Sequence, residues 1–280
     1  TLMSGMSITL RAQENSLTTW QVTVVTEEGG EIEMEVTGSS LQSALSSKNI
    51  KYPDITCLKA LSGTITNIDW NHIFNNSGNT ASTASTGFTN LTSLLAEEGV
   101  ISDGGLPIAS QSGRNFPKSL VTVKLPVGVE KISNSAFFEC SKLQTVILPD
   151  GIQEIGNYAF YQCTSLQEVI FSDQITSIGE GAFEGCTSLQ EVILPDQTTS
   201  IGESAFEGCT SLQEVILPDL ITSIGESAFK GCASLREAVL PQGITELPMN
   251  IFYGCQNLQK VTIPDDVTKI WDNAFYECQS

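Results

Sequence analysis

A repeat of 23 residues constrains the fold of this chain more than any other feature of its sequence. It is clearest in residues 187–209, TSLQEVILPDQTTSIGESAFEGC. Phe and Cys keep this step in two columns, Phe137, Phe160, Phe183, Phe206, Phe229, Phe252 and Phe275, and Cys140, Cys163, Cys186, Cys209, Cys232, Cys255 and Cys278. A fixed period of this size is typical of stacked units, none of which can bury its own apolar face alone. The sequence therefore predicts a solenoid.

Each unit is predicted to begin with a short strand. In the segment LQEVILP we expect Leu189, Val192 and Leu194 to point inward. Glu191 and Ile193 then point to the opposite, concave face. A Pro-Asp pair follows and ends the strand, because proline lacks the N–H group that a ladder needs.

The second half of each unit is predicted to return along the convex side. Ile201 is expected to point inward, and Gly202 to relax the backbone. Residues 203–208 are expected to form a short helical turn that brings Ala205 and Phe206 against the neighbouring coils. The Phe rings should then stack as a spine at the back of the core.

The consensus L-x-x-V-x-L-P-x-x-I-x-x-I-G-x-x-A-F-x-x-C resembles the 23-residue class of leucine-rich repeat found in BspA-like bacterial surface proteins. The resemblance spans residues 116–280, as an array of seven coils. It implies an α/β fold, a right-handed leucine-rich-repeat solenoid with short parallel strands on the concave face, short helical turns on the convex side and an N-terminal cap before it. It also implies a secreted, lipid-anchored or surface-displayed protein involved in adhesion, although fold alone does not determine function.

The chain departs from this pattern at a few positions. Ser172 stands where Pro is usual, Thr198 where Ile is usual, and Leu247-Pro248 where Ile-Gly is usual. Ile251 replaces the small Ala, so we expect the coil at 241–263 to pack more loosely.

Residues 1–115 are predicted to form the N-terminal cap, which closes one end of the hydrophobic stack. Its expected parts are a β-hairpin (20–25 and 31–36), a short helix (38–45), a degenerate coil (55–68), a low-complexity insertion (77–87) and a further strand-forming coil (88–95).

The net charge of −19 argues against nucleic acid or anionic lipid as a partner. No run of 18 apolar residues is present, so we expect no membrane span. The first residues, Thr1 to Gly5, lack the basic start and apolar stretch of a secretory signal. Because the resemblance implies a surface protein, we expect an extracellular or cell-surface location and a lipid anchor on a removed N-terminal segment.

Seven of the eight cysteines keep the repeat period at an inward position. An odd column cannot pair completely, and buried Cys is a good small hydrophobe, so we expect a ladder of reduced thiols. Cys57 is expected to be another core residue. No Cys-x-x-Cys motif occurs, so neither a metal site nor a cofactor is expected.

The concave face carries the candidate binding residues. Its apolar column is Ile147, Ile170, Ile193, Ile216 and Val239, and its acidic column is Glu168, Glu191, Glu214 and Glu237. Contiguous exposed apolar residues usually mark an interaction site, but β-branched side chains also pack well beside one another on a sheet. Both interpretations stay open.

The acidic column has three interpretations. No Lys or Arg occurs between Leu143 and Phe229, so the column could be a solvated face of duplicated coils that keeps the protein soluble and monomeric. It could also attract a cationic protein. Calcium is disfavoured, since it needs six to eight oxygen ligands and no D-x-D-x-D-G loop is present.

An enzyme is not expected. His72 is the only histidine, and no motif places a nucleophile near it. The glutamates occupy equivalent positions on an open face, which does not separate them into a general acid and a base. We expect a non-catalytic adhesion or recognition module that binds a host or bacterial surface protein, or a glycan, on its concave face. The alternative is a structural spacer or a self-assembling scaffold.

Overall fold

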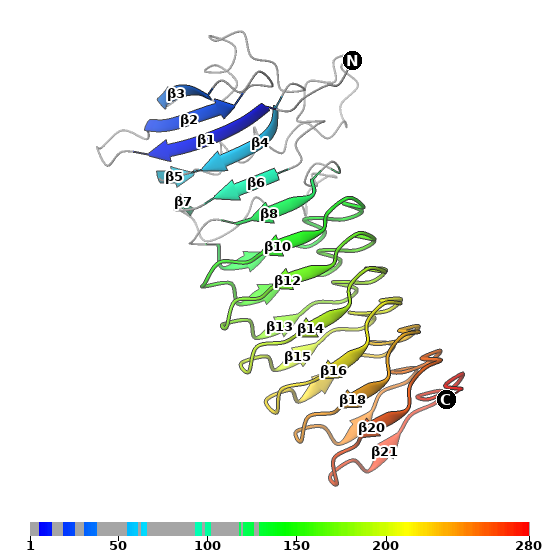
Figure 1. Ribbon diagram of the computed structural model, residues 1–280. Coiled ribbons are helices and arrows are strands. Elements are labelled where there is room, and N and C mark those ends of the chain that lie inside the picture. Colours follow the sequence, from blue (N-terminus) through cyan, green and yellow to red (C-terminus); the bar gives the residue numbers. More distant parts are fainter. Residues whose placement is uncertain are drawn as a thin grey trace, which may run out of the picture.

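The chain is a β-solenoid whose coils stack along one axis (Figure 1). The computed structural model describes residues 118, 120–125 and 129–279 in full, and before them only the backbone of seven strands. Neighbouring coils place residues 23 positions apart beside each other, for example Val146 opposite Val169. Each 23-residue repeat of the sequence therefore forms one coil of the solenoid.

The first strand of each coil contributes to a parallel front sheet. These strands are β8 (Thr122–Lys124), β10 (Thr145–Ile147), β12 (Glu168–Ile170), β14 (Glu191–Ile193), β16 (Glu214–Ile216), β18 (Glu237–Val239) and β20 (Lys260–Thr262). In each of them the middle residue turns toward the core, as Val146 and Val215 do. The predicted short parallel strands are confirmed, and we call their outer surface the front face.

A second set of strands, which the sequence did not predict as strands, runs behind the front sheet. It comprises β9 (Lys131–Ile132), β11 (Glu154–Ile155), β13 (Ser177–Ile178), β15 (Ser200–Ile201), β17 (Ser223–Ile224), β19 (Glu246–Leu247) and β21 (Lys269–Ile270). Strands β9, β11, β13, β15 and β17 form one parallel sheet, and β19 pairs with β21. The interruption between β17 and β19 coincides with Pro248, which has no N–H to donate where Gly225 donates to Ile201 O at 2.8 Å.

The convex side differs from the prediction, because its described part contains hydrogen-bonded turns in place of short helical turns. Ser204 has a φ of 51° and Gly208 a φ of 70°, both in the left-handed region that a right-handed helix excludes. Successive backbone amides in the turn donate alternately within their own coil and to the next coil. Ala205 N donates to Gly202 O of the same coil at 3.4 Å, and Phe206 N donates to Ala228 O of the next coil at 2.8 Å. These turns therefore join the coils as well as reversing the chain.

The core is built on the column of Phe rings. Consecutive rings stack with centroids 5.0 Å apart at Phe137–Phe160 and 5.9 Å apart at Phe229–Phe252. The spacing widens gradually along the column and is already 5.5 Å at Phe206–Phe229, so it does not single out the coil in which Ile251 replaces Ala. The looser packing expected there stays a prediction.

Seven described strands precede the array, of which five extend the front sheet and two pair with each other in a separate sheet. They are β1 (Met6–Ala12), β2 (Thr19–Val25), β3 (Glu31–Thr37), β4 (Ile55–Ala60), β5 (Gly63–Ile65), β6 (Ser93–Ala96) and β7 (Gly99–Ile101). The sheet order is β12-β10-β8-β6-β4-β1-β2-β3, in which β2 is antiparallel to both β1 and β3. The predicted helix at 38–45, the insertion at 77–87 and the side chain of Cys57 lie outside the described residues. The division at residue 115 into a cap and an array stays a prediction.

Candidate functional site

The front face carries a stripe of aliphatic side chains. We call Ile147, Ile170, Ile193, Ile216 and Val239 the isoleucine stripe. Its middle members are the most exposed, at 45% for Ile170, 72% for Ile193 and 58% for Ile216, while Ile147 and Val239 are half-buried. Exposing three adjacent large aliphatic side chains to water costs free energy and does not help to stabilise the fold.

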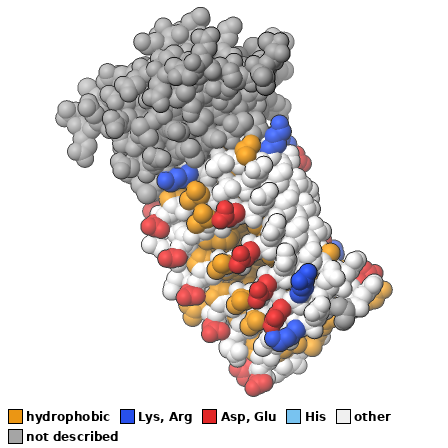
Figure 2. All heavy atoms as spheres, in the orientation of Figure 1, with side chains coloured by type: hydrophobic (Ala, Val, Ile, Leu, Met, Phe, Trp, Pro, Cys, Tyr) orange, Lys and Arg blue, Asp and Glu red, His pale blue; other side chains and the backbone are white. Residues whose placement is uncertain are grey.

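Carboxylates flank the stripe. The glutamate column consists of Glu168, Glu191, Glu214 and Glu237, each two residues before a stripe residue on its strand. Figure 2 shows hydrophobic side chains between two rows of Asp and Glu side chains on this face. Glu237 pairs with Lys260, whereas Glu168, Glu191 and Glu214 have no cationic partner among the described residues. Three carboxylates of the column are therefore open to an external cation.

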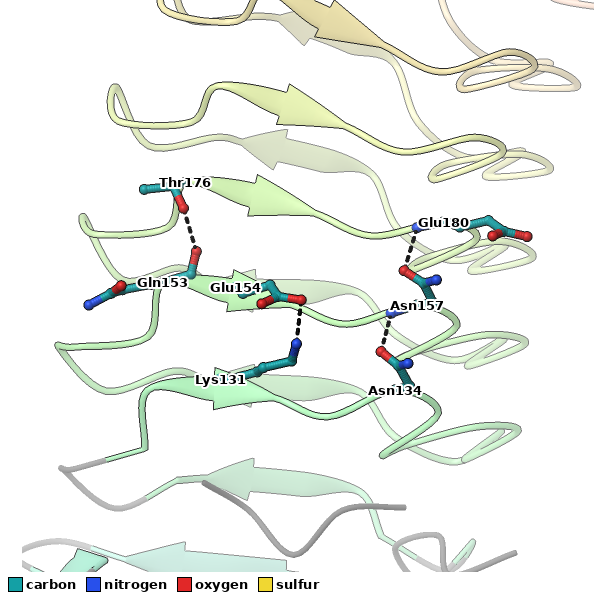
Figure 3. Close-up of polar contacts among 7 residues, drawn as sticks. All are labelled: Lys131, Asn134, Gln153, Glu154, Asn157, Thr176 and Glu180. Carbon is teal, nitrogen blue, oxygen red and sulfur yellow. Dashed lines mark hydrogen bonds and ion pairs between the residues drawn. The ribbon is translucent and has the colours of Figure 1, made fainter. Parts of the chain in front are cut away.

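On other faces, polar side chains are used to connect coils. Asn134 Oδ1 accepts a bond from Asn157 N at 2.9 Å, and Asn157 Oδ1 accepts one from Glu180 N at 3.1 Å (Figure 3). Lys131 Nζ lies 2.5 Å from Glu154 Oε1 across the same pair of coils. On the front face Glu237 and Lys260 also connect two coils, whereas Glu168, Glu191 and Glu214 have no ion pair within the described residues.

The front sheet is interrupted in the middle of the stripe. Strand β12 ends the eight-stranded sheet, and β14 begins a separate four-stranded sheet with β16, β18 and β20. Behind the gap the same two coils remain paired, because Ile178 lies opposite Ile201 and Phe183 N donates to Ala205 O at 2.8 Å. The opening is therefore confined to the front face.

We attribute the interruption to Phe171. This position holds a buried Leu in most other coils, including Leu148, Leu194 and Leu217. The Phe171 ring is half-buried and packs edge-on against Phe183, with centroids 6.0 Å apart. Leu148 N donates to Ile170 O at 3.0 Å, whereas Phe171 N and Leu194 N make no such bond to the next coil in the described structure. Since β14 and β16 remain paired beside Leu194, the attribution rests on the size and position of the Phe171 ring. A larger ring beside the strand end separates the two strands.

A cleft of about 480 Å³ lies over the gap. Its lining includes Glu168, Ile170, Phe171, Asp173, Glu191 and Ile193. A second hollow of about 290 Å³ lies between β14 and β16, beside Glu214 and Ile216. The first falls within the size range of ligand pockets, which run from roughly 300 to 1,000 Å³.

The structure places all nine predicted binding residues on the front face, in the two predicted columns. It brings four of them together around the larger cleft, namely Glu168, Ile170, Glu191 and Ile193. Phe171 and Asp173 also line the cleft but were not among the predicted binding residues. The replacement of Leu by Phe in the repeat was the signal that could have identified Phe171.

The described residues contain no group of three or more His, Cys, Asp or Glu side chains placed to hold a metal ion. They also contain no helix long and apolar enough to cross a membrane. The arrangement on the front face is suited to contact, with apolar side chains and carboxylates open to solvent.

Comparison with known families agrees with the repeat fold described above. The family described as BspA type leucine rich repeat region matches residues 115–218 and 153–280, in six copies. The chain belongs to this family. The BspA-type repeats thus cover the whole described array, and the resemblance noted in the sequence is confirmed.

Two solved leucine-rich-repeat proteins are similar to this chain over much of the array. A leucine-rich-repeat protein of T. pallidum has a TM-score of 0.55 and 33% identity, over 57% of this chain and 77% of that one. A leucine-rich-repeat protein of Bacteroides ovatus has the same TM-score and identity, over 56% of this chain and 43% of that one. This chain thus matches less than half of the Bacteroides ovatus protein. No curated protein matches it.

A more distant structure, a leucine rich cell surface protein of Faecalibacterium prausnitzii, has 18% identity and a TM-score of 0.34, over 95% of this chain and 87% of that one. This likeness is too low to indicate the function of the present chain.

Proposed function

We propose that this BspA-type array is a non-catalytic recognition module that binds a partner on its front face. The exposed centre of the isoleucine stripe carries the proposal, because Ile193 is 72% exposed between two further exposed isoleucines. Burying these side chains against a partner would recover the hydrophobic free energy that the free chain forgoes. Extended repeat arrays characteristically bind through such strand faces.

The partner we propose is a protein or glycan displayed at a host or bacterial surface, and the chain would act outside the cell, held by a lipid anchor. Membership of the BspA-type family supports the surface location. The unpaired carboxylates beside the stripe support a partner with basic groups at its rim. The module is proposed to act as a monomer preceded by an N-terminal cap at residues 1–115.

A binding screen against host matrix proteins and a glycan array tests the proposal. The decisive variant is the double substitution Ile170→Lys with Ile193→Lys, which removes the apolar contact without entering the core. The matched control is Ile270→Lys with Leu220→Lys, because these side chains are 53% and 51% exposed and lie off the front strands. The proposal predicts at least tenfold weaker binding for the first variant and little change for the control.

Clean monomers without any partner in the screen would contradict recognition and favour a structural spacer. A partner that tolerates the front-face variant would also contradict the proposal, since the contact would then lie elsewhere.

A further inference from the structure

The interrupted front sheet combines a cleft, an apolar lining and unpaired carboxylates in one place. We infer that the cleft between β12 and β14 binds an extended polypeptide segment in which a cationic residue lies two positions from a large apolar residue. This inference rests on the proposed recognition function and names the class of partner.

The shape of the cleft favours one large apolar side chain. Ile170 and Ile193 stand on its two sides, and Phe171 and Pro195 extend its apolar lining. Interface anchors are typically aromatic or Arg side chains that fill such a pocket at the centre of a contact. Insertion of an apolar side chain would cover the Phe171 ring, which is half-buried, whereas Leu148 and Leu217 at the same position of other coils are buried.

The charges select a cationic neighbour. Glu168, Glu191 and Asp173 all line the cleft, and none of them has an ion pair within the described residues. The chain offers no Lys or Arg between residues 143 and 229 that could neutralise them. A Lys or Arg of the partner would reduce the repulsion among these carboxylates and would donate a charge-assisted hydrogen bond to one of them.

The spacing selects an extended polypeptide. On β14, Glu191 and Ile193 are two residues apart, so their side chains leave the same face of the strand about 7 Å from each other. An extended partner segment has the same two-residue side-chain period. Its residues i and i+2 can therefore contact the carboxylate and the apolar lining at the same time. A neutral glycan would supply the apolar contact but not the cation.

The test uses a fluorescein-labelled peptide, Gly-Ser-Arg-Ser-Trp-Ser-Arg-Ser-Gly, in which each Arg is two positions from Trp. Its dissociation constant is measured by fluorescence anisotropy at low and moderate salt. We expect binding of about 100 μM or tighter at low salt, and at least tenfold weaker binding when both Arg residues are replaced by Glu.

Two protein variants locate the contact. The pair Glu168→Gln with Glu191→Gln should weaken peptide binding at least tenfold. The control pair Glu203→Gln with Glu226→Gln removes two exposed charges elsewhere and should change the dissociation constant less than twofold. The pair Phe171→Leu with Ser172→Pro restores the sequence of the other coils and should also weaken binding tenfold, by closing the cleft.

Absence of peptide binding, equal loss from both glutamine pairs, or unchanged binding to the restored coil would each overturn the inference. The proposed function can be tested independently of this inference. A partner from the screen that is lost with Ile170→Lys and Ile193→Lys but keeps its affinity for the restored coil would support front-face recognition while excluding the cleft.

Discussion

The thiol of Cys209 lies 3.2 Å from the backbone carbonyl oxygen of Phe183 in the preceding coil, to which it donates. The same oxygen accepts a bond from Cys186 N at 3.1 Å. The relationship recurs at a separation of 26 residues from Cys163 to Cys278. The cysteine column is thus a ladder of reduced thiols that joins neighbouring coils, as the sequence analysis predicted for the array.

Replacing Cys209 by Ala should lower the free energy of unfolding by about 1–2 kcal/mol, because a buried thiol and its weak hydrogen bond are lost. The cost stays moderate, since Phe183 O keeps its bond to Cys186 N. Urea unfolding measures the change. The control is Cys278→Ala, which should cost less because Cys278 is half-buried. Equal losses would show that burial does not set the cost.

The buried thiols should resist modification in the native protein. Titration with a thiol reagent is expected to reach Cys278 first and the six fully buried cysteines of the array only after denaturation. Burial keeps these thiols both inaccessible and protonated. Recovery of oxidised cysteines from these positions after denaturation would contradict the ladder.

Alkaline pH should destabilise the array. Burial raises the pKa of the Cys209 thiol from 9.0 to about 12, and it raises the pKa of Cys140 and of Cys255 to about 12. Between pH 9 and 12 the unfolded chain therefore binds fewer protons than the native chain, so stability falls as pH rises. Each thiol contributes up to about 1.4 kcal/mol per pH unit. Unfolding measured at pH 8 and 10.5 should show this decline, and Cys209→Ala should make it shallower. An identical decline in the variant would contradict the assignment.

Two glycines of one coil should respond differently to Ala. At Gly202 a Cβ atom would lie 2.5 Å from Glu180 N and from Gly179 C, so the backbone must move and the cost should be about 2–3 kcal/mol. At Gly208 the nearest atom is 3.8 Å away, and only the φ of 70° is unfavourable, which should cost about 1 kcal/mol. Thermal unfolding of both variants tests the order, and a larger loss at Gly208 would contradict the close backbone stacking.

Gln162 offers a stabilising substitution. Its φ is 54°, at the position where later coils carry Gly185, Gly208 and Gly231. Gln162→Gly should gain about 0.5–1 kcal/mol, because relief of the left-handed conformation exceeds the entropy lost by Gly. Gln190→Gly, at an exposed position without positive φ, should lose stability instead. A loss at Gln162 would show that the turn tolerates its residue without strain.

The front strands and the Phe spine could be predicted because their inward positions hold apolar residues in every coil. Val192 and Val215 keep the same place in each unit, and the side chains of Phe206 and Phe229 are buried. Burial leaves little freedom at such positions, so the sequence pattern and the structure agree.

The convex turns could not be predicted in the same way. Their left-handed positions hold Ser135, Tyr158, Gly181 and Asn250 in different coils, a mixture that carries no common signal. The strands of the second sheet are two residues long, which is too short for any periodicity. Both features arise from contacts between coils, and so depend on the stack.

The candidate site was predicted in part. Exposure of Ile193 and its neighbours follows from strand alternation, so the two columns could be placed from the sequence. The gap between β12 and β14 could not, because Ser172 attracted notice as a departure while the change that we hold responsible, Leu to Phe at Phe171, preserves an apolar residue. The volume of a side chain matters here more than its polarity.

Hydrogen–deuterium exchange of the free protein and of its complex with a partner from the screen tests front-face recognition most directly. The account predicts that protection on binding concentrates in peptides covering β12, β14 and β16, and that β13, β15 and the convex turns change little. Protection concentrated in the second sheet or the convex turns, with β12, β14 and β16 unchanged, would contradict it.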